Sequence, residues 1–217
     1  MRSFISKFIN IPFILGVSFV FFSFILGIFL RNGLIIFLSW NMILALMVYV
    51  FSSIALELHE RQFKWIWIVI SIALWILFFP NSFYILTDTI HFQNYEFFKH
   101  YPNIYELDSY EWYVFFDITI AALISLKIGL MSLEQIKKIV PNALKQYQLL
   151  LIIGLFFISS IGIYLGRFIR LNSWNIFDLS SIISGVLEHF NFFVVFVLLF
   201  TMIHLIAYYL YKNKGEH

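Results

Sequence analysis

The sequence predicts an all-α polytopic membrane protein, a bundle of about six transmembrane helices with an amphipathic helix at the outer membrane surface. Hydrophobic residues make up 62% of the 217 residues, charged residues 12%, and the mean hydropathy is +0.90. Soluble domains are nearer half apolar and a quarter charged, and a core of this size cannot bury so much apolar surface. Lipid leaves backbone groups no partner outside the chain, so the spanning segments must be helices.

Six apolar runs approach or exceed the roughly 20 residues that a helix needs to cross the hydrocarbon layer. They cover residues 10–30, 34–56, 65–85, 112–131, 149–166 and 191–211. The first run is too long for a typical signal peptide and no small-residue cleavage site follows it, so we expect a retained anchor. No repeat and no Pro- or Gly-rich linker divides the chain, and we predict one domain over residues 1–217.

The basic residues predict a protein of the cell membrane with both termini in the cytoplasm, because cytoplasmic loops carry an excess of Lys and Arg. With this orientation four of the 14 basic residues lie outside, Arg31, Lys99, Arg167 and Arg170. The other ten lie inside: Arg2, Lys7, Arg61, Lys64, Lys127, Lys137, Lys138, Lys145, Lys212 and Lys214.

Two outer segments are expected at the membrane surface. Residues 179–190 place apolar side chains at helical spacing opposite serines, with Asp178 at the N-cap position. We expect this helix to lie flat on the outer surface, and favour that over a re-entrant hairpin. The loop over residues 86–111 is rich in Tyr and Phe, which prefer the headgroup zone, so it should follow the membrane surface.

Local motifs predict further helix boundaries and contacts. Ser132 and Gln135 match a capping box that opens a short inner helix, which Pro141 ends. Gly162 and Gly166 form a GxxxG step, which allows a second helix to approach closely.

Unusual polar and aromatic residues gather at the predicted outer face, whereas the inner ends carry mostly lysines. Five separate segments deliver them. The residues are Trp40, Asn41, Pro80, Asn81, Tyr84, Asp88, His91, Trp112, Asp117, Gly166, Arg167, Arg170, Asn172, Trp174, His189 and Asn191. This asymmetry is the main functional indication in the sequence.

Asp117 lies five residues inside Trp112, about 7 Å along the helix. An isolated carboxylate there is costly, so it should face other helices and pair with Arg167 or Arg170. The pair is either a structural link that fixes helix register or part of a binding or proton-handling site. Arg167 and Arg170 are three apart, so on a continuing helix they share a face and suit a phosphate or carboxylate. The alternative is that both extend to lipid headgroups.

Asp88 and His91 are also three residues apart, a spacing at which a carboxylate can orient an imidazole as a general base. An N-cap aspartate beside a surface histidine is the alternative. We predict no metal site, since the pair lacks further ligands. His204 lies at mid-membrane without a second histidine at that depth, which argues for a bond to a neighbouring helix and against haem.

Other classes of function are excluded. The chain has no cysteine and a net charge of only +2, so disulfides, thiolate catalysis and nucleic-acid binding are not expected. No nucleotide-binding, zinc-protease or hydrolase motif is present. We therefore expect no cofactor.

Three motifs, 38–41 (LSWN), 77–88 (LFFPNSFYILTD) and 164–174 (YLGRFIRLNSW), resemble a bacterial family of integral membrane proteins catalogued as domain of unknown function 1361. The resemblance covers the chain from the second helix to the sixth and implies the fold, but no activity. The sequence departs from the family pattern at Phe83, where the family has Pro. It also places Asp117 further from the opening Trp than the family does.

We expect an outer-face site that binds or acts on an anionic, lipid-linked substrate, with membrane lipid as the partner. Whether the protein is an enzyme is open. A small transporter and an accessory or assembly subunit are the alternatives. Proton transfer or orientation is assigned to Asp88, His91 and Asp117. Substrate binding is assigned to Asn81, Tyr84, Arg167, Arg170, Asn172 and Trp174.

Overall fold

The computed structural model describes residues 9–99, 104–170 and 179–211. Six helical spans in it are long and apolar enough to cross a membrane, as the sequence predicts. They are Ile11–Phe29, Gly33–Glu60, Trp65–Asn94, Ser109–Ile139, Gln148–Ile169 and Phe190–Tyr211. The fold is thus all-α and polytopic, and the only strands in the described chain form one short hairpin.

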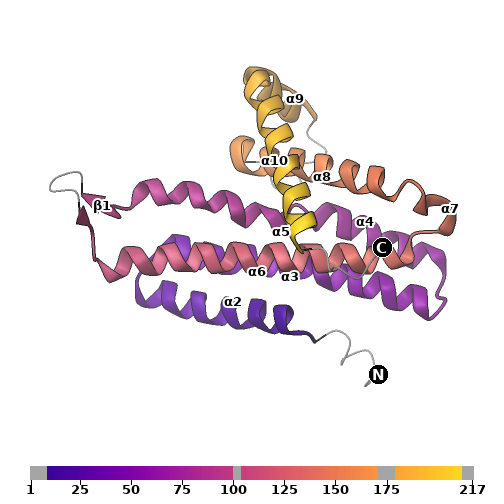
Figure 1. Ribbon diagram of the computed structural model, residues 1–217, viewed down its shortest axis with the longest axis horizontal. Helices are drawn as coiled ribbons and strands as arrows, with labels where there is room; N and C mark the ends of the chain where they lie inside the picture. The colour runs from indigo at the N-terminus through magenta and orange to yellow at the C-terminus, as the bar shows by residue number, and fades with distance from the viewer. Residues whose placement is uncertain (1–8, 100–103, 171–178, 212–217) are drawn as a thin grey trace. The chain divides into compact units, whose positions relative to one another are not determined.

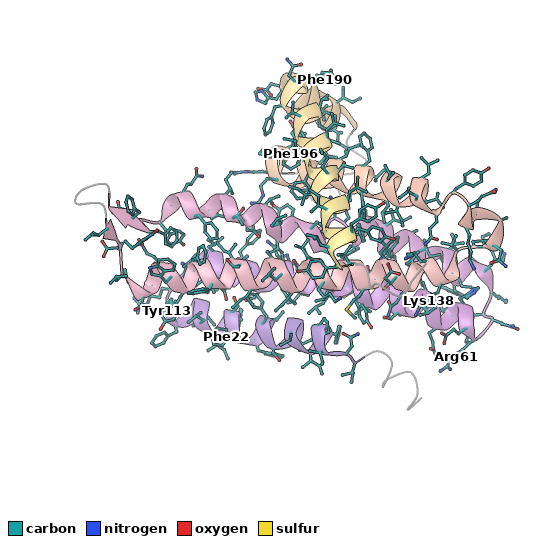
Figure 2. All side chains as sticks on the ribbon, viewed as in Figure 1. Phe22, Arg61, Tyr113, Lys138, Phe190 and Phe196 are labelled. Atoms are coloured by element: carbon teal, nitrogen blue, oxygen red, sulfur yellow. The ribbon has the colours of Figure 1, made fainter. Side chains whose placement is uncertain are left out.

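Large apolar side chains cover the outside of these helices. Phe22 on α2 is 66% exposed and Tyr113 on α6 is 52% exposed, and Figure 2 shows both pointing away from the helices that carry them. Such side chains would be unfavourable in water but are favourable against lipid tails.

The chain forms two compact units, and α3 (Gly33–Glu60) and α6 (Ser109–Ile139) contribute to both. Unit 1 combines Met1–Val50 with Asn81–Gly129, and unit 2 combines Phe51–Pro80 with Leu130–His217. The single domain over residues 1–217 stays a prediction.

In unit 1, α2 (Ile11–Phe29) lies alongside α3 and α6 (Figure 1). The Asn10 carboxamide caps α2 by accepting from the backbone N–H of Phe13 at 3.0 Å. Small residues permit the close approach: a Cβ added to Gly16 would lie 2.9 Å from the Leu46 side chain on α3 and 3.0 Å from that of Ile128 on α6.

The third span differs from the sequence prediction, which ended it at residue 85. It comprises α4 (Trp65–Phe78), the short helix α5 (Asn81–Tyr84) and the 3₁₀ helix η1 (Ile85–Asn94). Pro80 cannot donate a backbone hydrogen bond, and α4 ends just before it. Helical structure nevertheless continues to Asn94, so the loop predicted to start at residue 86 begins later.

The connection from η1 to α6 contains the strands β1 (Phe98–Lys99) and β2 (Ile104–Tyr105), which pair antiparallel. Aromatic rings fill this region, and the Phe97 ring lies 5.7 Å from that of Trp112. The expected contact of this aromatic segment with the headgroup zone stays a prediction.

The predicted capping box at Ser132 and Gln135 is wrong, because α6 continues without interruption to Ile139. Both side chains instead bond to other helices of unit 2. The buried Ser132 hydroxyl accepts from the indole N–H of Trp75 at 2.9 Å, and the Gln135 carbonyl accepts from Ser53 at 3.1 Å. Pro141 does follow the helix end, and the short helix α7 (Asn142–Lys145) begins directly after it.

In unit 2, α10 (Phe190–Tyr211) crosses α8 (Gln148–Tyr164), as Figure 1 shows. The fully buried His204 joins them: its Nδ1 lies 2.8 Å from the Phe200 carbonyl and its Nε2 lies 3.0 Å from the Ser159 hydroxyl. A carbonyl can only accept, so Nδ1 carries the proton and Nε2 accepts from Ser159. The predicted bond to a neighbouring helix is confirmed.

Close packing at Gly162 also agrees with the sequence, since an added Cβ would lie 3.1 Å from the Pro80 ring. The predicted amphipathic helix forms as α9 (Leu179–Glu188), and its Gly185 packs against the side chain of Ile169. Its predicted cap, Asp178, lies outside the described residues. That α9 lies flat on the outer surface stays a prediction.

Gly129→Ala should destabilise the protein. In unit 1 the new Cβ would lie 2.6 Å from Ser82 Cβ, and overpacking of this kind costs about 1–3 kcal/mol. We expect a lower melting temperature in detergent, followed by circular dichroism. The matched control is Gly154→Ala, whose Cβ meets nothing within 4 Å. Equal melting temperatures for the two variants would contradict the close approach of α5 and α6.

Candidate functional site

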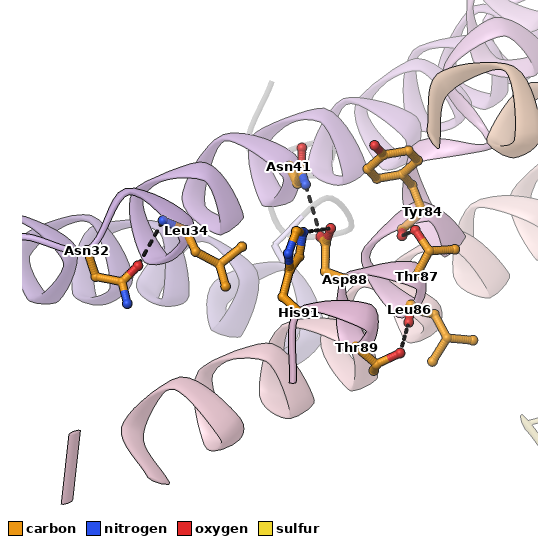
Figure 3. Close-up of polar contacts among 9 residues, drawn as sticks. All are labelled: Asn32, Leu34, Asn41, Tyr84, Leu86, Thr87, Asp88, Thr89 and His91. Atoms are coloured by element: carbon orange, nitrogen blue, oxygen red, sulfur yellow. Dashed lines mark hydrogen bonds and ion pairs between the residues drawn. The ribbon is translucent and has the colours of Figure 1, made fainter. Parts of the chain in front are cut away.

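The candidate site is centred on the carboxylate of Asp88, which η1 carries into the interior of unit 1. Asp88 has no exposed surface, and its Oδ2 accepts from Asn41 Nδ2 at 3.1 Å (Figure 3). Asn41 is itself 5% exposed and belongs to the part of α3 that contains no charged residue. A charged group at membrane depth costs about 2.5–3.5 kcal/mol, so this position requires compensating donors.

His91 lies one turn after Asp88 on the same helix. Its Nε2 is 4.0 Å from Asp88 Oδ1, and the two form an ion pair when the imidazole is protonated. The His91 side chain is 31% exposed, whereas that of Asp88 is fully buried. The alternative of an N-cap aspartate is wrong, because Asp88 lies inside η1, whose N-cap is Tyr84. The arrangement places a buried carboxylate at ion-pair distance, longer than a hydrogen bond, from a partly exposed imidazole.

The backbone of η1 is unusual, because 3₁₀ helices seldom exceed a few residues and this one has ten. Two hydroxyls bond to carbonyls three residues earlier, Thr87 to Tyr84 at 2.6 Å and Thr89 to Leu86 at 2.9 Å (Figure 3). Long 3₁₀ segments often mark functional or strained sites.

Asn32 links the loops beside the site, a role that the sequence analysis missed. Its Oδ1 caps α3 by accepting from the backbone N–H of Leu34 at 2.8 Å. Its Nδ2 donates to the hydroxyls of Tyr110 at 2.8 Å and Tyr95 at 3.2 Å. Burial raises the pKa of the Tyr95 phenol above its ordinary value. The position of Asn32 directly before the helix that starts at Gly33 could have indicated the capping role in the sequence.

Asp117 lies on α6 in unit 1 and is 4% exposed, and its Oδ2 lies within hydrogen-bond distance, 2.8 Å, of the Ser23 hydroxyl. Serine is common in membrane helices, so nothing in the sequence marked Ser23 as its partner. No basic side chain forms an ion pair with Asp117 among the described residues of unit 1. Pairing with Arg167 or Arg170 of unit 2 stays a prediction.

The two arginines do not continue an α-helix, which corrects the basis for placing them on one helical face. After α8 the chain winds as a π-helix, η2 (Leu165–Ile169), and Arg170 ends it in the left-handed conformation with φ of 60°. A left-handed residue commonly terminates a helix. Arg167 is half-buried and Arg170 is exposed.

The remaining predicted residues fall into two groups. Asn81 and Tyr84 begin and end α5, one turn or more before Asp88, and both are half-buried in unit 1. Asn172 and Trp174 lie outside the described residues. The prediction that all these residues share one cavity is untested and stays a prediction. Within the described ranges, no three His, Asp or Glu side chains are placed to hold a metal ion.

These features define a polytopic α-helical membrane protein with ionisable side chains buried in both of its units. The chain belongs to the family described as protein of unknown function (DUF1361), which matches residues 40–207 and so confirms the resemblance seen in the sequence. No curated protein and no solved structure matches the chain.

Asn41→Leu should lower the melting temperature by the equivalent of about 1–3 kcal/mol, because it removes an amide donor from a buried carboxylate. Adding Asp88→Asn should restore part of this loss, since a neutral amide is easier to bury than a charge. Phe37→Leu, at a 42% exposed position of the same helix, serves as the control. Additive effects of the two site changes would show that the bond is energetically unimportant.

Proposed function

We propose that the protein is a multi-pass cell-membrane protein, with both termini in the cytoplasm, that binds an anionic lipid-linked substrate at the outer face. In this proposal Arg167 and Arg170 of unit 2 bind the phosphate of the headgroup, and the role of Asp88 and His91 of unit 1 is to handle a proton. The observation that carries the proposal is the fully buried Asp88 carboxylate beside a partly exposed His91.

The environment of Asp88 favours function over a purely structural bond. A bond that only holds helices together needs no ionisable group: between α10 and α8, the Thr201 hydroxyl donates to Ser160 at 3.1 Å. At Asp88, by contrast, a carboxylate lies beside the neutral amide donor of Asn41 and the titratable imidazole of His91. Ionisable residues within membrane spans commonly mark substrate or proton pathways.

The arginines fit the anionic part of the substrate. A guanidinium offers several donors in a plane that matches phosphate oxygens, and it remains charged at all relevant pH values. Both arginines also lie on the side predicted to be outside, where they run against the usual distribution of basic residues. The alternative, contact with bulk headgroups, predicts no retention of a particular lipid.

Lipid retention tests this proposal. The wild type, purified in mild detergent, should carry a phosphate-bearing lipid that mass spectrometry of the extract detects. Arg167→Gln with Arg170→Gln should reduce this retention about tenfold or more, because charge-assisted hydrogen bonds contribute about 1.5–3 kcal/mol each. Asp88→Asn should retain the lipid, since its role is proton handling.

The control for lost charge is Arg31→Gln, an exposed arginine on the same predicted side. It should leave lipid retention unchanged. If the double arginine variant keeps as much of the lipid as the Arg31 variant, the arginines only contact bulk headgroups and the proposed site is wrong.

Membrane orientation is tested by single cysteines, which the chain permits because it has none of its own. Gln93→Cys, at an exposed position near the end of η1, should react with an impermeant thiol reagent on intact cells. Lys212→Cys should react only after the membrane is permeabilised. The reverse labelling pattern would place the site on the cytoplasmic side.

A further inference from the structure

Asp117 is a second buried carboxylate of unit 1, and its surroundings differ from those of Asp88. It lies on α6 and contacts Ser23 of α2, whose hydroxyl also lies 3.2 Å from the Ile35 carbonyl of α3. Ser23 and Ile35 have no exposed surface, and Asp117 is 4% exposed. Three helices therefore meet at a small cluster of oxygen atoms inside unit 1.

Among the described residues of unit 1, no neighbouring charge stabilises an ionised Asp117. Residues 11–29 of α2, which include Ser23, and residues 33–50 of α3, which include Ile35, contain no charged side chain. On α6 itself the nearest charged residues are Glu111, six residues before it, and Lys127, ten residues after it. On η1, Asp88 accepts from Asn41, and its Oδ1 lies 4.0 Å from His91 Nε2. A buried charge without a partner is unfavourable, so the position favours the neutral acid.

The hydrogen-bond donors lead to the same conclusion. The Ser23 hydroxyl has one proton but two acceptors in reach, the Ile35 carbonyl and Asp117 Oδ2. If Asp117 is ionised, the single Ser23 proton can bond to only one of them, although the Ile35 carbonyl also accepts from the Ser39 hydroxyl at 3.4 Å. If Asp117 is protonated, its O–H donates to Ser23 Oγ and the Ser23 proton remains for Ile35, so both short contacts become hydrogen bonds.

We propose that Asp117 is a proton-binding site, a carboxylic acid that donates to Ser23 within a relay ending at the Ile35 carbonyl. Asp88 receives an amide donor and faces an imidazole, which suits the ionised form. Two carboxylates of one unit are thereby held in opposite protonation states, the arrangement by which proteins assign acid and base roles. This assignment does not rest on the lipid-linked substrate proposed above.

Infrared spectroscopy of the full-length protein in lipid nanodiscs at neutral pH tests the proposal. The wild type should show the carbonyl band of a protonated carboxylic acid, with the downshift that deuterated buffer causes. Asp117→Asn should lose the band yet fold, because the amide N–H can replace the acid O–H as donor to Ser23. Ser23→Ala should move the band to higher wavenumber.

Ser39→Ala is the matched control. The Ser39 hydroxyl also reaches the Ile35 carbonyl, at 3.4 Å, but has no bond to Asp117, so its loss should leave the band in place. If Asp117→Asn does not fold, ¹³C labelling of aspartate carboxyls combined with Ser23→Ala assigns the band without it. A wild type that lacks the band, as an Asp117 ion-paired with an arginine would, overturns the proposal. A band that Ser23→Ala does not shift overturns it as well.

Discussion

A polar group that lipid shields from water must find its hydrogen-bond partner within the chain, and this constraint shapes both units. In unit 1 it places Asn41 beside Asp88 and Ser23 beside Asp117. In unit 2 it connects Ser159 with His204. The apolar surface itself cannot specify which helices pack together, because contact with lipid tails is as favourable as contact with another apolar helix. The few buried polar contacts therefore specify the packing within each unit.

The six spans could be predicted because lipid demands long apolar helices, and composition alone reveals them. Their ends were less predictable. The third span continues past Pro80 to Asn94 although its last residues include Thr87, Asp88 and Gln93, which resemble a loop when judged by polarity. The capping box at Ser132 failed for a related reason. A capping motif indicates a helix start only where the side chains are free to cap the backbone. Here Ser132 lies inside α6 and its hydroxyl accepts from the Trp75 indole instead.

The candidate site was predictable in its residues but not in its partners. The spacing of Asp88 and His91 places them on neighbouring turns of a helix, and Asn41 at membrane depth needs a hydrogen-bond partner. Which group would supply that bond depends on how helices far apart in sequence meet. Ser23 was missed because a single serine carries little information. The arginine spacing was misleading, since the π-helix at Leu165–Ile169 breaks the regular turn on which the argument depended.

The winding of η1 has a consequence for the pair that it carries. In a 3₁₀ helix, residues three apart lie directly above one another, whereas in an α-helix they are rotated by roughly 60°. The alignment of the Asp88 carboxylate with the His91 imidazole is therefore tied to this tighter coil. Rewinding the ten residues of η1 as an α-helix would also shorten them by about 5 Å, at about 2.0 Å rise per residue against 1.5 Å. The backbone thus couples the length of the third span to the geometry of its two ionisable side chains.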